Sequence, residues 1–364
     1  MVVVEDAPGY QDLQHEDDAL KDLAYNPGAT DATYWDELSG EALDPEAVRK
    51  ARREEVEFMV AWKVWEEVPI EICWKATNKN PLGGRWVDVN KGDSLAPNVR
   101  CRYVAKELAL TKSDDFFAAM PPLEALRTLI SHAATGRRCG SGGRKLLVID
   151  ARKAHLHATP DREVFVELPP ELRRKGFCGR LRRCLYGTRD APKRWEAYLS
   201  GELRKMGFLQ GVASACCFQH KSRDVRCVVH GDDFVFVGCD ADLAWIEQEM
   251  AKSFLTKVVG KLGGDADDLK EIRVLNRVLR WTPEGITYEA DPRHAEILAR
   301  DWAPGGPSVK TAGVKPSASD ATAEEEQLSA PEVSAFRSGA ARANYLAMDR
   351  PDCAYATKEL CRHF

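Results

Sequence analysis

Two adjacent carboxylates, Asp232 and Asp233, follow Gly231 between two runs rich in valine and phenylalanine, residues 228–230 and 234–237. Such runs favour strands, and a Gly-Asp step between them is typical of the tight turn of a β-hairpin. Adjacent like charges repel, so the pair is stable at the turn only where water or a divalent cation takes up the charge. The motif predicts a hard-metal site that prefers Mg²⁺ or Mn²⁺. An ordinary aspartate-containing turn is the alternative.

A third carboxylate, Asp150, ends the continuous apolar run 146–149. That run predicts a strand buried on both faces, with the carboxylate at its C-terminal end. A shared sheet would bring Asp150 to the hairpin, although a helix N-cap is the other interpretation of this residue. Three carboxylates in one cleft are what two-metal phosphoryl transfer needs, with the metals roughly 3.5–4 Å apart.

Positive charge is unevenly distributed in a chain whose net charge is −5. Arg100, Arg102 and Lys106 alternate along the predicted strand 99–108, so they project from one face, where a triphosphate would neutralise them. Residues 173–194 hold nine arginines and lysines and one acid, Asp190. A local basic face is the expected footprint of a polyanion partner. Simple solvent exposure is the alternative for both groups.

The composition is that of a soluble globular protein with about two domains: 364 residues, 44% hydrophobic and 30% charged. The start has no signal-peptide pattern, and no apolar run approaches ~18 residues, which predicts a cytoplasmic or nuclear protein without a membrane partner. The eleven cysteines are scattered and form no Cys-x-x-Cys pair. We therefore expect reduced thiols rather than disulfides or a zinc site.

Periodicity and capping residues predict the remaining elements. The acidic residues 1–43 are expected to be a flexible lead-in, and residues 304–330 a linker. The expected helices are 44–63, 123–134, 191–206, 241–254, 292–302 and 331–348. The expected strands are 65–72, 85–89, 99–108, 145–150, 163–168, the two arms of the hairpin and the segment 272–288.

Several blocks, in their order along residues 54–364, resemble the reverse transcriptase of copia-type retrotransposons, a part of the Pol polyprotein. Residues 100–106 are similar to the family's Lys-Ala-Arg-Leu-Val-Ala-Lys, and residues 150–156 to its Asp-Val-x-x-Ala-Phe-Leu. Residues 185–195 look like Leu-Tyr-Gly-Leu-Lys-Gln-Ala-Pro-Arg-x-Trp, and residues 230–233 occupy the place of Tyr-Val-Asp-Asp. The other similar blocks are 65–68, 85–91, 115–127 and 345–352.

The resemblance implies an α+β right-hand polymerase, with fingers, palm and thumb, whose mainly antiparallel palm sheet carries the catalytic carboxylates. The domains that it implies are fingers 44–144, palm 145–259 with a return to the fingers at about 155–195, and thumb 260–303. The linker 304–330 would then lead to residues 331–364, the start of a truncated connection toward an RNase H region.

The activity implied is an RNA-directed DNA polymerase that adds deoxynucleotides to a primer. Asp150, Asp232 and Asp233 would be the catalytic residues and would hold two Mg²⁺ or Mn²⁺ ions. The partners would be an RNA template, a DNA primer and deoxynucleoside triphosphates, with the oligomeric state open. The implied nucleotide-binding residues are Arg100, Arg102, Lys106, His155, Tyr186, Gly187, Arg189, Asp190 and Pro192.

Three residues depart from the family pattern. His155 stands where the family has an aromatic residue that blocks the ribose 2′-OH, and His230 replaces a tyrosine on the primer side. Asp190 replaces a glutamine and requires Arg189, Arg194 or a metal to neutralise it. Two other functions therefore stay open. One is a catalytically degenerate fragment that binds nucleic acid, and the other is an unrelated metal phosphodiesterase.

Overall fold

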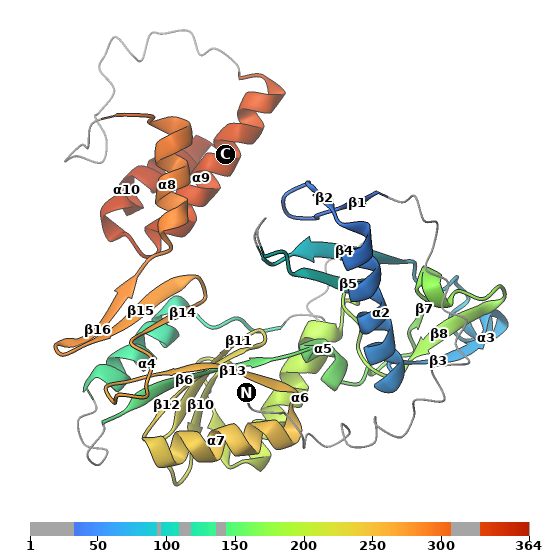
Figure 1. The fold of residues 1–364 in the computed structure, drawn as a ribbon, viewed down its shortest axis with the longest axis horizontal. Coiled ribbons are helices and arrows are strands. Elements are labelled where there is room, and N and C mark those ends of the chain that lie inside the picture. Colours follow the sequence, from blue (N-terminus) through green and yellow to red (C-terminus); the bar gives the residue numbers. More distant parts are fainter. Residues whose placement is uncertain (1–32, 93–95, 109–117, 136–142, 307–327, 364) are drawn as a thin grey trace. The chain divides into compact units, whose positions relative to one another are not determined.

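The computed structural model describes residues 33–92, 96–108, 118–135, 143–306 and 328–363. The chain divides into two compact units, residues 1–259 and 260–364. Both units mix helices and strands, as the sequence predicts (Figure 1). The acidic residues 1–32, Asp115 and Phe116 of the family block, and most of the expected linker lie outside the described residues. In the described part of the chain, no helix is long and apolar enough to cross a membrane.

Unit 1 is built on a six-stranded sheet in the order β13-β6-β12-β11-β10-β9. The predicted hairpin forms its centre, because β11 pairs with β12 in antiparallel register and β12 pairs with β6 on its other side. The strands are β6 (Lys145–Ala151), β9 (Phe208–Gln210), β10 (Cys217–His220), β11 (Arg226–His230), β12 (Asp233–Gly238) and β13 (Thr256–Leu262).

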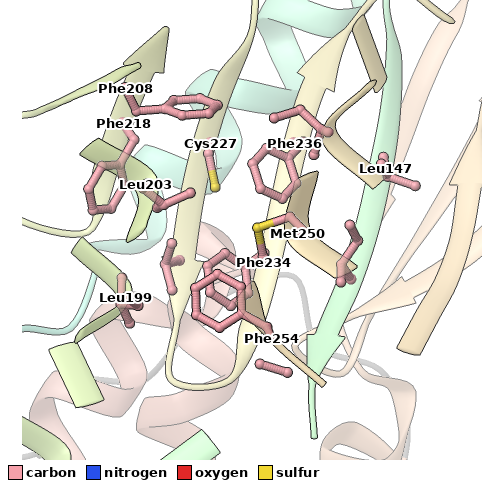
Figure 2. Packing of buried hydrophobic residues seen from close by; sticks show 14 of the residues in the cluster. Leu147, Leu199, Leu203, Phe208, Phe218, Cys227, Phe234, Phe236, Met250 and Phe254 are labelled. Carbon is pink, nitrogen blue, oxygen red and sulfur yellow. The ribbon is translucent and has the colours of Figure 1, made fainter. Parts of the chain in front are cut away.

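Two helices cover one face of this sheet, α6 (Ala191–Lys205) and α7 (Asp240–Ser253), both close to their predicted bounds. Their apolar residues pack on alternate residues of the strands, as period-2 alternation requires. Figure 2 shows Leu199 and Leu203 of α6 and Met250 of α7 around Phe234 and Phe236 of β12. A third helix, α4 (Leu123–Thr135), packs against β11, β12 and β6. The apolar run 146–149 is accordingly buried throughout.

A buried histidine, His157 of the short helix α5 (Ala154–His157), lies among aromatic rings of this core. Its ring centroid is 4.9 Å from that of Trp62 and 5.9 Å from that of Trp195. Nε2 lies 3.1 Å from the backbone oxygen of Arg152. Burial lowers the pKa of His157 to about 4, so the imidazole is neutral in the fold.

We predict that His157 makes unit 1 acid-sensitive. Because the pKa is lower in the folded than in the unfolded chain, its contribution is complete above about pH 6.5 and is lost as the pH falls toward 4. Between pH 7.5 and 5 the wild type should lose about 2 kcal/mol through this group, at about 1.36 kcal/mol per pKa unit. Urea unfolding at the two pH values should show that the free energy of unfolding of His157→Phe falls by about 2 kcal/mol less than that of the wild type. Equal losses in both proteins would refute the assignment.

A smaller sheet of unit 1 contains the first seven residues of the predicted strand 99–108, which ends at Ala105. The hairpin of β4 (Gly84–Asn90) and β5 (Val99–Ala105) packs on the helix α2 (Pro45–Ala61). An ion pair fixes it there, since Arg52 Nη2 of α2 lies 2.5 Å from Asp88 Oδ2 of β4. A three-stranded sheet in the order β3-β8-β7 lies in the same unit, made of β3 (Trp65–Pro69), β8 (Phe177–Leu181) and β7 (Phe165–Val166).

Two local predictions are wrong. Residues 70–72 continue the expected strand 65–72 in the sequence, but the structure has a helix, α3 (Ile70–Thr77), directly after Pro69. The apolar run was short enough to fit either period. The lead-in expected to extend to residue 43 contains a small antiparallel pair, β1 (Tyr34–Trp35) and β2 (Ala42–Leu43), held by hydrogen bonds from Leu38 and Asn90 amides to the Asp36 carboxylate.

Unit 2 has a three-stranded antiparallel sheet and three α-helices among its described residues. Arg277 ties the two together, because its buried guanidinium contacts the Asp349 carboxylate at 2.9 Å and donates to the Tyr345 hydroxyl at 2.9 Å. The elements are β14 (Glu271–Val274), β15 (Arg277–Thr282), β16 (Gly285–Glu289), α8 (Pro292–Trp302), α9 (Ala330–Ala347) and α10 (Ala354–Leu360). The helices 292–302 and 331–348 were predicted nearly to the residue.

Candidate active site

The first two carboxylates lie directly opposite each other. In the antiparallel pairing of β6 and β12, Asp150 is the partner of Asp233. Opposed residues of antiparallel strands have their Cα atoms about 4.5–5.5 Å apart and project from the same face. Both side chains therefore leave the sheet on the face opposite the α6 and α7 cluster, because that cluster takes the neighbouring residues Ile149 and Phe234.

Asp232 occupies the turn between β11 and β12, beside this pair. The turn is held from two sides: the Ala151 amide donates to the Asp232 backbone oxygen at 2.8 Å, and Trp195 Nε1 donates to the Gly231 backbone oxygen at 2.8 Å. Gly231 has a φ of +66°, which favours glycine. These hydrogen bonds hold the turn that carries Asp232 next to the ends of β6 and β12, where Asp150 and Asp233 lie.

Electrostatic strain is built into this arrangement. Burial and then the negative charge of Asp232 raise the pKa of Asp150, and the same two causes raise the pKa of Asp233 to about 6. Lys257, Arg152 and Arg102 act in the opposite direction on Asp150. The carboxylates therefore favour a positively charged partner.

A divalent metal fits the chemistry of these donors. Carboxylate oxygens are the ligands of Mg²⁺ and Mn²⁺, and a cation would offset the burial and the repulsion that raise both pKa values. Within the described ranges, however, no group of three or more His, Cys, Asp or Glu side chains is close enough together to hold a metal ion. The three carboxylates are present, but their side chains are not gathered around one point as metal ligands would be.

The positive residues of β5 lie on one exposed face of the strand, as the alternation predicts, and Arg102 acts on the charge of Asp150. Arg100 and Arg102 are exposed, while Cys101 and Tyr103 between them are buried. The Arg102 guanidinium lies 5.5 Å from the centroid of the Tyr186 ring. Lys106 follows the strand, is exposed, and donates its amide to Gly83.

His155 and Tyr186 lie close enough to the carboxylates for the charge of Asp232 to act on the pKa of both. Their ring centroids are 5.2 Å apart. Burial lowers the pKa of His155 against the opposing effect of Asp232, and burial raises the pKa of Tyr186 to about 12, with Asp232 and Asp150 adding to the rise. The structure therefore brings Arg102, His155 and Tyr186 to the side of the carboxylate group.

A family model described as reverse transcriptase (RNA-dependent DNA polymerase) matches residues 65–264, which include all of these residues. The chain belongs to the reverse transcriptase family. The resemblance to copia-type retrotransposon Pol polyproteins is confirmed by relatives of that class.

These relatives are two Pol polyproteins of plants. The chain is 25% identical over 179 residues to the retrovirus-related Pol polyprotein from transposon TNT 1-94 of Nicotiana tabacum, which covers 46% of this chain and 13% of the relative. It is 26% identical over 226 residues to that from transposon RE2 of Arabidopsis thaliana, covering 59% and 14%. The chain thus spans about one seventh of the length of these relatives.

Solved structures with some likeness are an apo telomerase from Candida tropicalis and a foamy viral protease-reverse transcriptase in complex with double-stranded DNA. For the telomerase the TM-score is 0.41 at 8% identity, covering 71% of this chain and 63% of that one. For the foamy viral protein it is 0.41 at 10% identity, covering 81% and 40%.

The loop 185–190 of this chain is bound to the end of β5. The Ala105 amide donates to the Tyr186 backbone oxygen at 2.8 Å. Gly187 has a φ of +82°, and a Cβ at this position would lie 2.1 Å from the Ala105 backbone oxygen. Pro192 is in the first turn of α6, where its missing N–H costs nothing. The Arg189 amide donates to Glu107 at 2.9 Å.

Asp190 has a partner, Arg162, that the sequence did not suggest. It is buried, and its Oδ1 lies 2.8 Å from Nη2 of Arg162. Arg189, Arg194 or a metal had been expected to neutralise it. Arg194 instead lies 3.3 Å from Asp161.

Four of the nine cations in the basic stretch 173–194 form ion pairs with acids in or beside neighbouring strands. Because β8 pairs with β3 and β7, the arginines in and beside β8 lie opposite acids in and beside those two strands. The ion pairs are Arg173–Glu167, Arg174–Glu67, Arg180–Glu163 and Arg182–Glu66. Arginines 173, 174, 180 and 182 therefore form a ladder of exposed ion pairs with these acids.

Sequence reasoning missed two cations and an ion pair at the site. Lys257 of β13 and Arg152 both act on the charge of Asp150, and nothing in their local sequence signalled this. Lys153 has a φ of +57° and pairs with the buried Glu55 of α2. Glu55 follows Val48 by seven residues and precedes Met59 by four, so its place on the apolar stripe of the helix was a detectable signal.

Proposed function

We propose that this chain is an RNA-directed DNA polymerase that extends a primer by two-metal phosphoryl transfer. The observation that supports it most is the pairing of Asp150 with Asp233 in adjacent strands, with Asp232 in the connecting turn. In this proposal the fold is a right hand, with fingers 44–144 and 155–195, palm 145–259 and thumb 260–303. Residues 304–330 form a linker and residues 331–364 begin a connection.

The three carboxylates would hold Mg²⁺ or Mn²⁺. Two such ions, when bound, activate the attacking hydroxyl and stabilise charge on the leaving oxygen. The protein's own contribution is positioning: β6 and β12 set the spacing of Asp150 and Asp233, and Trp195 holds the turn that carries Asp232.

The nucleotide would lie against Arg102 of β5 and Tyr186 of the loop 185–190. Arg100, Arg102 and Lys106 would bind its phosphates, and the exposed fork of Arg102 suits bidentate phosphate contacts. Tyr186 and Gly187 would pack against the nucleotide, with His155 on the side of its sugar. An RNA template and a DNA primer are the polymers this arrangement would hold, and deoxynucleoside triphosphates are the substrates.

A second candidate function is nucleic-acid binding without catalysis. One observation favours it: the carboxylates, among the described residues, are not closed into a three-ligand metal group. In that case the chain would keep the fold and the phosphate-binding cations and lack nucleotide addition.

Primer extension on poly(rA)/oligo(dT) with Mg²⁺ or Mn²⁺ separates the two functions. We expect the chain to extend the primer, and Asp232→Asn to do so at least about 10³-fold more slowly, because loss of one electrostatic donor to a transition state already costs 10²–10³ in rate. No extension by either protein, with salt-sensitive template binding preserved, would favour the second function. Equal extension by both would refute the role of Asp232, and absence of both activities would refute both functions.

A further inference from the structure

A cluster of three charged side chains, of which Asp190 is buried and Arg162 and Glu107 are partly buried, lies next to the loop 185–190. The guanidinium of Arg162 donates to both carboxylate oxygens of Glu107, at 2.8 and 2.6 Å, and to Asp190 Oδ1 at 2.8 Å. These residues come from three separate segments: the end of β5, the connection before β7, and the start of α6. The planar fork of arginine allows one side chain to bridge two carboxylates in this way.

The cluster joins the two segments that border the proposed nucleotide site. Glu107 also accepts the Arg189 amide at 2.9 Å, so one carboxylate contacts both Arg162 and the loop. Two residues earlier, the Ala105 amide donates to the Tyr186 backbone oxygen at 2.8 Å. The loop that carries Tyr186 and Gly187 is thereby fixed on β5, the strand that carries Arg102.

Removal of the Arg162 charge would leave two acids facing each other in a poorly solvated place. The Asp190 side chain is 4% exposed and that of Glu107 14%. Asp190 Oδ2 is buried and has no hydrogen-bond partner in the described structure, while Oδ1 accepts from Arg162. An uncompensated buried charge is strongly unfavourable, and the loop would move to hydrate it.

We infer that Arg162 is a positioning residue of the nucleotide pocket: it holds Asp190 away from the nucleotide and keeps Tyr186 beside Arg102. This inference rests on the proposed function. The nucleotide then meets Arg102, Tyr186 and Gly187 and is spared the negative charge at position 190. Loss of Arg162 should weaken nucleotide binding more than the chemical step.

The test compares Arg162→Met with Arg182→Met, a matched control that removes an exposed arginine paired with Glu66. In primer extension, Arg162→Met should raise KM for dTTP at least about tenfold, a loss of about 1.4 kcal/mol in binding, and change kcat less than about threefold. The control should change neither. The all-neutral triple variant Glu107→Gln, Arg162→Met, Asp190→Asn should recover KM to within about threefold of the wild type, because no uncompensated charge remains.

A second readout does not depend on polymerase activity. Hydrogen exchange of the Ala105 and Arg189 amides should be at least about tenfold faster in Arg162→Met than in the wild type or the control. If the wild type extends primers and Arg162→Met leaves KM unchanged, the inference is wrong and the proposed function stands. If the wild type does not extend primers, the proposed function is wrong, and unchanged exchange would overturn the positioning role as well.

Discussion

Asp233→Asn is expected to abolish primer extension and at the same time to stabilise unit 1. The activity should fall at least about 10³-fold, because the variant removes one of the three carboxylates proposed to hold the metal ions. The stability should rise because Asp233 is partly buried, faces Asp150 across the strand pair, and lies beside Asp232. Asparagine has the same shape without the charge.

The size of the gain follows from the pKa of Asp233, which is raised to about 6. Above pH 6 the carboxylate is ionised in the folded and the unfolded chain, so the full cost of burying its charge is present. The shift corresponds to about 3 kcal/mol at 1.36 kcal/mol per unit, and partial exposure reduces it to about 1–3 kcal/mol. The gain should shrink as the pH falls from 6 toward 3.8.

Urea unfolding at pH 7.5 and pH 4.5, run beside primer extension, measures both effects. Asp232→Asn is the matched control, because its exposed carboxylate should give the same loss of extension with a smaller gain in stability. An Asp233→Asn protein that is inactive and less stable than the wild type would contradict the electrostatic account of this pair.

Gly187→Ala should lower the free energy of unfolding by about 2–5 kcal/mol. A left-handed backbone costs a residue with a Cβ about 1–2 kcal/mol. The new Cβ would also lie 2.1 Å from the Ala105 backbone oxygen and 2.5 Å from Val104 Cγ1. Overpacking of this kind costs about 1–3 kcal/mol, and the backbone atom of β5 cannot move aside as a flexible side chain would.

Gly201→Ala is the control for this substitution. Gly201 lies inside α6, and a Cβ there would meet nothing within 4 Å, so alanine should stabilise the helix by about 0.5–1 kcal/mol. In the control, the free energy of unfolding should rise by that amount and KM for dTTP should stay unchanged. In Gly187→Ala, the free energy of unfolding should fall and KM for dTTP should rise. Similar behaviour of the two variants would show that the close approach to β5 is unimportant.

Patterns local in the sequence predicted local structure well. The hairpin around Asp232 and Asp233 was predicted from two valine- and phenylalanine-rich runs and a glycine, and α6 and α8 from a proline at the helix start and apolar spacing. The alternation of Arg100 and Arg102 on one face of β5 followed from the period of a strand. The failure at residues 70–72 came from a run too short to separate strand from helix.

The three carboxylates and the cations of the candidate site were identified from residue types and spacing, and the role of the loop 185–190 from the resemblance to the reverse transcriptase family. Sequence could not assign partners to the charges, because each partner is distant along the chain. Arg162 neutralises Asp190 across 28 residues, and Glu66 pairs with Arg182 across 116. Those pairings depend on which strands and loops meet.

The sequence by itself therefore determined the hairpin, the identity of its acids and the family, because short-range propensity and residue order carry that information. The tertiary structure decided the register that sets Asp150 opposite Asp233, the burial that raises their pKa values, and the ion cluster that turns Asp190 into a partner of Arg162. Register, burial and ion pairing arise from contacts between segments far apart in the chain, and the free energy of those contacts is fixed only when the whole sheet has formed.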